Sequence, residues 1–268
     1  MFLTLNVVII NKILQLKKYI LFFIVVFAAG TVKAQSGYTY QQFGVGVDAG
    51  YVHGYTNLAT QYSHPSYSIS GVYSLTPYIP IAAELQFGQL SGGDSPYNVY
   101  NPAAPLDKYG RGYVNTYKAF YLHADYQLGN DIDYSYGTFL QIIKNFYVGT
   151  GIGFVSNNNQ NQRTNLIPSN GSTSYVFPGK STGVDPVLPL RVGYEFKIYN
   201  YYNVPSMALD LGYTQYIDFG SGLDGYSNPP PFKQKYLNQY GQFVVSLKFF
   251  FGEPVPYNKL IRPFNYNY

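Results

Sequence analysis

Charged side chains make up only 11% of this 268-residue chain, and some of them lie where apolar and polar residues alternate. Carboxylates and basic groups that share one face can relay protons or ions, or they can pair with one another as a structural plug. We favour the plug, because an unpaired charge away from water is costly. The residues are Glu84, Asp125, Arg191, Glu195, Lys197, Asp210 and Lys248, with Asp48 in the same phase of its segment.

Serine, histidine and aspartate invite a second chemistry, because together they can form a nucleophile, its base and the group that orients the base. Geometry makes such a triad, and a histidine in a loop is usually only solvated. We therefore predict no catalytic residue, cofactor or enzyme activity, and we find no metal-ligand spacing of histidine or cysteine. The residues concerned are His53, Ser63, His64 and Ser66, with Asp94, Asp107, Asp218 and Asp224; a further histidine, His123, is predicted to lie in the lumen.

The stretch FYVGTGIGFV, residues 146–155, resembles a phosphate-binding loop at first sight. Its glycines run G-x-G-x-G with apolar residues between them, whereas the dinucleotide fingerprint is G-x-G-x-x-G followed by a helix. A repeat of two residues predicts a strand with one small face. Phe43 to Tyr51 repeats the pattern, so we predict that the small faces pack inside a lumen; the lumen glycines are Gly44, Gly46, Gly149, Gly151 and Gly153.

The elements that would position all these residues are strands. Alternation with the same sense recurs in eight segments, and an even number suits an antiparallel barrel made from one chain. The segments are 43–51, 67–75, 81–87, 120–128, 146–155, 190–198, 207–214 and 242–249. The chain is predicted to be all-β, with residues 35–252 forming one eight-stranded antiparallel transmembrane β-barrel.

The links between segments are alternately short and long. TPYIP and YNYYNVP are short, whereas the links on the other side are long and polar. Short periplasmic turns and long extracellular loops are typical of transmembrane barrels. Residues 129–145 break the rule, and within them GTFLQIIKN predicts a short helix.

The polar face tells which side points outward. A soluble barrel needs a charged exterior, yet the charged fraction is less than half of the roughly 25% usual for soluble domains. We therefore predict that the apolar side chains face lipid; a secreted lipocalin-like barrel is the alternative. An eight-stranded barrel is just wide enough to be filled by side chains, so no open pore is expected.

The first residues have the form of a secretory signal. Lys17 and Lys18 precede the apolar run YILFFIVVFAAG, and Val32-Lys33-Ala34 suits cleavage before Gln35, which gives a signal peptide of residues 1–34. Removing Lys12, Lys17, Lys18 and Lys33 from 17 basic residues leaves 13 against 13 acidic ones. A balanced charge gives no reason to expect a nucleic-acid partner.

The mature chain resembles the small outer-membrane β-barrels of the OmpA and OmpX type found in Gram-negative bacteria, through SLTPYIPIAAELQFGQLSGGD and FYVGTGIGF. The resemblance implies a monomer in the bacterial outer membrane with a structural or surface-interaction role. Some members modify lipid A with histidine and serine at the outer rim, which makes a lipid A acyl hydrolase or transferase the enzymatic alternative. Residues 253–268 extend past the expected last strand and are predicted to be a periplasmic tail.

Partners other than lipid must use the loops, because both strand faces are occupied. Residues 91–113 and 156–186 are the candidates for an extracellular glycan or protein ligand, or they are solvated loops without a partner. NNNQNQ supplies amides that hydrogen-bond sugars, and the first loop supplies tyrosines for stacking. Tyrosines near strand ends are predicted to form girdles at the membrane surface: Tyr51, Tyr67, Tyr126 and Tyr213.

Overall fold

The computed structural model describes residues 38–94, 106–107, 110–134, 137–160, 165–166, 175–176, 180–226 and 236–259. The predicted signal peptide lies outside these ranges. Their strands are β1 (Tyr38–Tyr55), β2 (Gln61–Thr76), β3 (Ile79–Gly93), β4 (Gly112–Gln127), β5 (Phe146–Gln160), β8 (Thr182–Tyr199), β9 (Pro205–Asp218) and β10 (Gln239–Tyr257). Two short strands, β6 (Asn165–Leu166) and β7 (Tyr175–Val176), pair only with each other.

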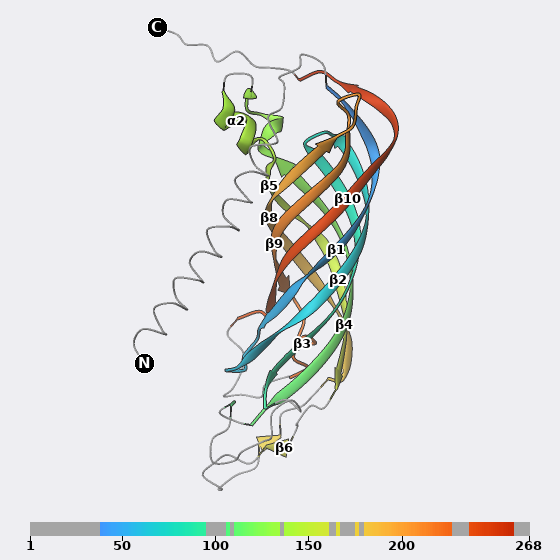
Figure 1. Ribbon diagram of the computed structural model, residues 1–268. Coiled ribbons are helices and arrows are strands. Elements are labelled where there is room, and N and C mark those ends of the chain that lie inside the picture. The colour runs from blue at the N-terminus through green and yellow to red at the C-terminus, as the bar shows by residue number, and fades with distance from the viewer. Residues whose placement is uncertain are drawn as a thin grey trace, which may run out of the picture. The chain divides into compact units, whose positions relative to one another are not determined.

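The eight long strands close into a barrel in the order β1-β10-β9-β8-β5-β4-β3-β2, and Figure 1 shows them wrapping around one axis. Every neighbouring pair is antiparallel. The ring is completed between β1 and β10, where Tyr38 lies opposite Tyr257 and Tyr55 opposite Gln239. Because the ring has no edge, each backbone group in the wall has a neighbouring strand to bond. The predicted eight-stranded antiparallel barrel is confirmed.

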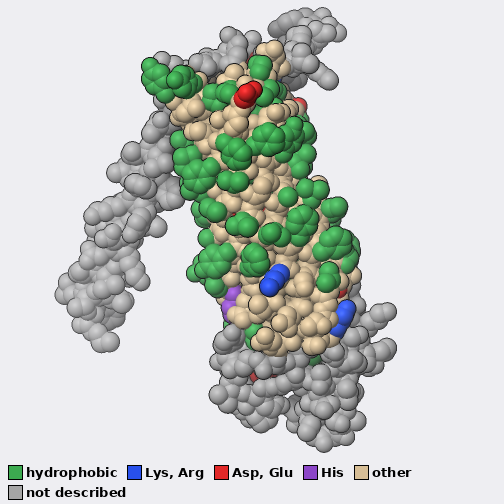
Figure 2. All heavy atoms as spheres, turned by 90° about the vertical axis from the view of Figure 1, so that its right-hand side faces the viewer, with side chains coloured by type: hydrophobic (Ala, Val, Ile, Leu, Met, Phe, Trp, Pro, Cys, Tyr) green, Lys and Arg blue, Asp and Glu red, His purple; other side chains and the backbone are tan. Residues whose placement is uncertain are grey.

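The outward side chains are the apolar ones, as the alternation predicted. On β1, Phe43, Val45 and Val47 are 51%, 49% and 54% exposed, whereas Gly44 and Gly46 between them face the lumen and are buried. Figure 2 shows hydrophobic side chains spread over the wall of one side of the barrel. This is the reverse of a soluble barrel, which keeps its apolar face inside.

Several strands run further than the sequence indicated. β5 continues to Gln160 and β8 begins at Thr182, so the loop expected at 156–186 spans only 161–181. The loop expected at 91–113 likewise narrows to 94–111, and the β1–β2 link contains only residues 56–60. The apolar members of the alternation end earlier than the hydrogen-bond ladder, which continues past them.

The last strand also corrects the expected domain boundary at residue 252. β10 reaches Tyr257, and Val255, Pro256 and Tyr257 lie opposite Tyr40, Thr39 and Tyr38 of β1. A register shift near Phe43 and a positive φ of 102° at Gly252 mark the point where the ladder bends without ending. Residues 253–257 therefore belong to the barrel.

The short and long links separate the two ends of the barrel. β2–β3 and β8–β9 are joined by residues 77–78 and 200–204 at the end where β1 begins and β10 ends. The third link at this end, between β4 and β5, holds a 3-10 turn, η1 (Leu128–Asn130), and the predicted short helix, α2 (Thr138–Ile143). No helix among the residues described is both long and apolar enough to cross a membrane.

Candidate functional site

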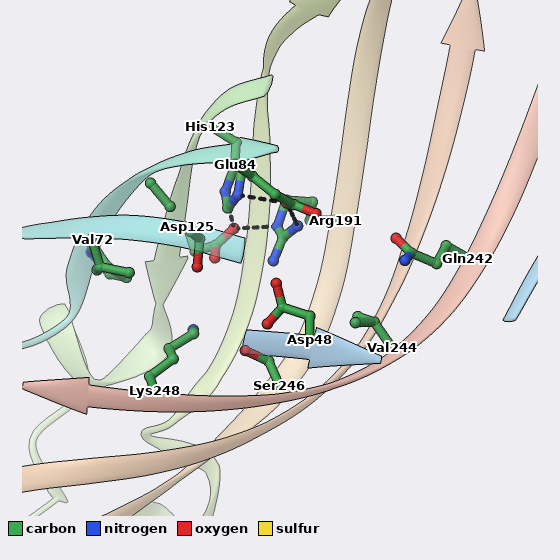
Figure 3. Close-up of a pocket in the computed structure, with 13 residues that line it drawn as sticks. Asp48, Val72, Glu84, His123, Asp125, Arg191, Gln242, Val244, Ser246 and Lys248 are labelled. Carbon is green, nitrogen blue, oxygen red and sulfur yellow. Dashed lines mark hydrogen bonds and ion pairs between the residues drawn. The ribbon is translucent and has the colours of Figure 1, made fainter. Parts of the chain in front are cut away.

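The lumen near the short-turn end holds a buried ion cluster built on Arg191, which projects inward from β8. Its Nε donates a hydrogen bond to Asp125 Oδ1 at 2.9 Å, and its Nη1 lies 3.6 Å from Glu84 Oε2. Figure 3 shows the three side chains converging from different strands. One guanidinium therefore serves two carboxylates that are each almost fully buried.

His123 lies between the same two carboxylates, in the lumen, where the sequence analysis placed it. Its Nε2 is 3.3 Å from Glu84 Oε2 and its Nδ1 is 3.7 Å from Asp125 Oδ1. The imidazole therefore contacts both carboxylates that Arg191 serves.

A second cluster is centred on Lys248 of β10. Its Nζ donates to Asp210 Oδ2 at 2.7 Å and to Glu195 Oε2 at 2.8 Å. Tyr147 donates from its hydroxyl to the other oxygen of Asp210 at 2.9 Å. Each carboxylate thus has a charged partner, which is the condition under which buried charges are tolerated.

Lys197 closes the short-turn end of this cluster. Its Nζ donates to Gln127 Oε1 at 2.7 Å and to the carbonyl of Pro77 in the β2–β3 turn, and it lies 3.8 Å from Glu195 Oε1. The same ammonium lies 4.6 Å from the centre of the Tyr78 ring. The contacts tie a turn to the lumen side chains.

All seven predicted plug residues therefore face the lumen and are brought into two clusters. A cavity of about 20 Å³ lies beside them, lined by Asp48, Ser246 and members of both clusters (Figure 3). Asp48 points into it and accepts a hydrogen bond from Ser68 Oγ at 2.6 Å. A volume of this size holds about one water molecule.

Tyrosines fill the lumen toward the other end, a role that the sequence analysis missed. The rings of Tyr216 and Tyr240 stack at 4.4 Å, Tyr121 packs on Tyr216 at 4.8 Å and Tyr117 on Tyr240 at 5.5 Å. Gln86 bonds the Tyr216 hydroxyl at 3.0 Å. The sequence did contain a signal for this role. Tyr121 alternates with the outward residues of its segment, so its side chain had to point inward.

Loop residues fold into the long-loop end. Arg111 Nη2 lies 3.0 Å from Asp107 Oδ1, and Tyr226 donates from its hydroxyl to the Gly112 carbonyl at 2.8 Å. Asp185 accepts from Asn157 Nδ2 at 3.1 Å and from the Gly222 amide at 2.8 Å. The contacts of Tyr226 and Gly222 join residues 219–226 to the barrel wall. We call residues 219–226 the mouth segment.

The mouth segment carries a buried carboxyl, Asp224, outside the strands. Burial raises the pKa of Asp224 to about 6, although the Tyr226 amide and the positive charge of Arg111 favour its ionised form. Its Oδ1 accepts from the Tyr226 amide at 3.0 Å. The carboxyl is therefore easier to protonate in the closed mouth than in water.

The rim residues considered for catalysis do not form one group. His53 Nδ1 lies 3.0 Å from Ser63 Oγ, whereas His64 Nε2 lies 2.6 Å from Ser91 Oγ, and Ser66 accepts from Gln242 inside the lumen. The four aspartates bond loop backbone or arginine: Asp94 accepts from the Leu106 amide, Asp107 from Arg111, Asp218 from the Gly220 amide and Asp224 from the Tyr226 amide. Within the described ranges, no group of three or more His, Asp or Glu side chains is placed to hold a metal ion.

The lumen glycines lie where the cross-strand neighbour leaves no room for a side chain. A Cβ at Gly151 would lie 2.6 Å from His123 Cα, and one at Gly149 or Gly153 would overlap Asp125 or Tyr121. On β1, a Cβ at Gly44 would lie 2.9 Å from the Phe250 ring, and one at Gly46 would overlap Ser70 Oγ. The glycines on β5 thus make space for the large polar residues of β4, and nothing in their geometry resembles a phosphate loop.

No protein-family model and no curated protein matches this chain significantly. Similar solved structures include Neisserial surface protein A (13% identity, TM-score 0.40), Ail, the attachment invasion locus protein of Yersinia pestis, solved with the heparin analogue sucrose octasulfate (10%, 0.35), and the outer membrane protein OprG from Pseudomonas aeruginosa (10%, 0.36). These similarities cover 78%, 78% and 80% of this chain and 97%, 99% and 98% of the respective chains. The barrel architecture given above rests on the strand pairing of this chain itself.

Proposed function

We propose that this protein is a bacterial outer-membrane β-barrel with a structural or surface-interaction role and no open pore. The single observation that carries the proposal is the inverted wall, with exposed apolar side chains outside and paired charges inside. A signal peptide of residues 1–34, cleaved before Gln35, provides its route across the inner membrane.

The apolar wall has the height that a bilayer requires. On β1 the outward apolar side chains run from Phe43 to Tyr51, and on β10 from Phe243 to Phe251. A tilted strand needs about 9–11 residues to cross the hydrocarbon core.

On β4 the outward apolar set ends at Phe120, and the next outward residue toward the loops is Lys118. A lysine at that border can extend its ammonium into the headgroups.

Solubility and gel mobility test the membrane location. The mature protein should require detergent, show β-type circular dichroism and run with heat-modifiable mobility. Membrane fractionation should recover it with the outer membrane, with an N-terminus at Gln35. Purification as a stable soluble monomer without detergent would favour the lipocalin-like alternative.

Planar bilayers test the closed lumen. The ion clusters, the tyrosines and the mouth segment occupy the lumen in turn along its axis, so the protein should give no steady conductance. A variant that combines Tyr121→Ala, Tyr216→Ala and Tyr240→Ala removes the stacked rings and should conduct at least intermittently if it folds. Large, steady conductance of the unaltered protein would contradict the closed lumen.

A glycan or protein ligand at the loops remains a proposal that rests on exclusion, because lipid and lumen occupy both faces of the wall. Most of the two candidate loops, including 95–105 and 167–174, lies outside the described residues. Binding of intact cells to a glycan array should fall when residues 167–174 are deleted, while the heat-modifiable mobility remains. Unchanged binding would remove this loop as the contact.

A lipid A-modifying activity is the second candidate, and the contact between His64 and Ser91 is the observation that favours it. A serine 2.6 Å from an imidazole nitrogen has the contact that activates a nucleophile. Lipid A extracted with and without the gene should differ if the activity exists. The His64→Ala variant should then abolish the difference, whereas His53→Ala, which lies in the other pair, should not.

A further inference from the structure

The β4–β5 link is long at an end where the other links are turns. It runs from Leu128 to Asn145, includes η1 and α2, and stands beside the barrel near the start of β5 in Figure 1. Lys259 Nζ donates to the carbonyls of Gly129 and Ile132 in this link, and the Glu195 amide donates to the carbonyl of Asn145 at 3.1 Å. The link is therefore attached to strand β8 of the barrel and to the segment that follows β10.

Helix α2 leaves two large apolar side chains exposed. Phe139 is 70% exposed and Ile142 is 42% exposed, and their spacing of three residues puts them on the same side of the helix. Lys144 and Asn145, which follow the helix, are buried. The other apolar side chains of the helix, Leu140 and Ile143, are half-buried, so apolar side chains lie on both sides of it. A short helix on the surface of a water-soluble protein instead exposes a polar side.

The place where α2 touches the wall is on the apolar outer face of the barrel. The Tyr194 hydroxyl donates to the Ile142 carbonyl at 2.6 Å. Tyr194 lies on the outward face of β8, between Val192 and Ile198, which are 38% and 48% exposed. Because Ile198 is nearer to the β8–β9 turn than Tyr194, the apolar wall continues past the contact with the helix.

The hydrogen bond from Tyr194 has a particular value in that position. The last carbonyls of a helix have no partner within the helix, and in lipid, where no water can bond it, an unpaired carbonyl is unfavourable. Here one of them is bonded by a side chain of the wall. The helix also keeps its own backbone bonds, from the Gln141 amide to Gly137 and from the Lys144 amide to Leu140.

We propose that α2 is an interfacial anchor, whose Phe139 and Ile142 side chains insert among the phospholipids of the leaflet at the short-turn end. The proposal rests on the proposed membrane location. It fits lipid because the exposed side of the helix carries large apolar side chains, and the helix contacts the apolar outer face of the barrel at Tyr194. If these side chains instead contacted water or a second copy of the chain, a fluorescent residue at the same positions would give a different emission wavelength or a different response to quenchers in the lipid.

Fluorescence can test this directly because the chain contains no tryptophan. Phe139→Trp reports on the helix. Ile69→Trp is the lipid reference, since Ile69 is 54% exposed in the middle of β2, and Tyr236→Trp is the water reference, since Tyr236 is 78% exposed in the β9–β10 link. Each full mature chain is folded into phosphatidylcholine vesicles with bromine atoms either high or deep in the acyl chains.

The expected result separates the three positions. Phe139→Trp should emit at shorter wavelength than Tyr236→Trp and lose more fluorescence to shallow bromines than to deep ones. Ile69→Trp should lose most to deep bromines, and Tyr236→Trp should lose little to either. Ile142→Trp, on the same side of α2, is the second reporter if Phe139→Trp lacks the heat-modifiable mobility of the folded barrel.

The outcomes that overturn the inference are distinct from failure of the membrane location. If Ile69→Trp is quenched but Phe139→Trp emits like Tyr236→Trp, the helix faces water. If Phe139→Trp emits at short wavelength without quenching, protein covers it, as in a dimer. If Ile69→Trp is not quenched either, the apolar wall does not face lipid and the proposed function itself is wrong.

Discussion

Replacing Lys248 by methionine tests whether the lumen charges hold the barrel together. Methionine keeps most of the length of lysine but removes the ammonium that lies 2.7 Å from Asp210 Oδ2 and 2.8 Å from Glu195 Oε2. Glu195 keeps Lys197 at 3.8 Å and a hydrogen bond from Gln127 at 3.0 Å. Asp210 keeps the Tyr147 hydroxyl, which carries no charge.

The structure therefore predicts a large loss from one substitution. Removing one partner of a buried ion pair costs about 3–5 kcal/mol, because the other charge is left without compensation. With a urea m value of about 2 kcal/mol per M, the unfolding midpoint falls by about 1.5–2.5 M. Adding Asp210→Asn should restore part of this loss, because it removes the carboxylate that Lys248→Met isolates.

Equilibrium unfolding of the protein in vesicles by urea measures these differences, with gel mobility as the readout of the folded fraction. Lys118→Met is the matched control, since Lys118 is exposed on the outer face of β4. It should change the free energy of unfolding by less than about 1 kcal/mol. If Lys248→Met is no less stable than Lys118→Met, the lumen ion pairs do not stabilise the barrel and the charged side chains only occupy space in the lumen.

Further predictions concern the glycine face and the mouth. Gly151→Ala should destabilise the barrel by about 1–3 kcal/mol, because its Cβ would lie 2.6 Å from His123 Cα. Gly71→Ala is the control, since no atom lies within 4 Å of its Cβ. In the same urea titration it should be neutral or slightly stabilising. The pKa of Asp224 is raised to about 6 in the folded protein, so the folded state binds this proton more tightly than the unfolded chain does. The resulting stabilisation is fully present below about pH 4, and the free energy of unfolding falls by up to about 3 kcal/mol as the pH rises to about 6. Asp224→Asn should therefore be more stable than the unaltered protein at neutral pH and equal to it near pH 4; equal midpoints at both pH values would contradict the raised pKa.

The wall of the barrel could be predicted because its pattern is local. A period of two residues assigns each side chain to a face, whatever the partner strand is. Phe43 and Gly44 could thus be placed outside and inside without knowing that β10 lies beside them. The ends of the strands could not be predicted, because outside the apolar band the alternation no longer marks a strand, and only pairing, as between Tyr38 and Tyr257, shows where a strand stops.

For the lumen, the sequence by itself determined which side chains point inward and that both acids and bases are among them. The tertiary structure decided the partners: Arg191 meets Asp125 and Glu84, whereas Lys248 meets Asp210 and Glu195. Partners in a narrow barrel come from strands far apart in the chain, and their relative heights depend on strand tilt and stagger around the ring. No local pattern carries that information. The same reason separates His64 from Ser66 and joins it to Ser91, since cross-strand register, and not distance along the chain, decides which side chains meet.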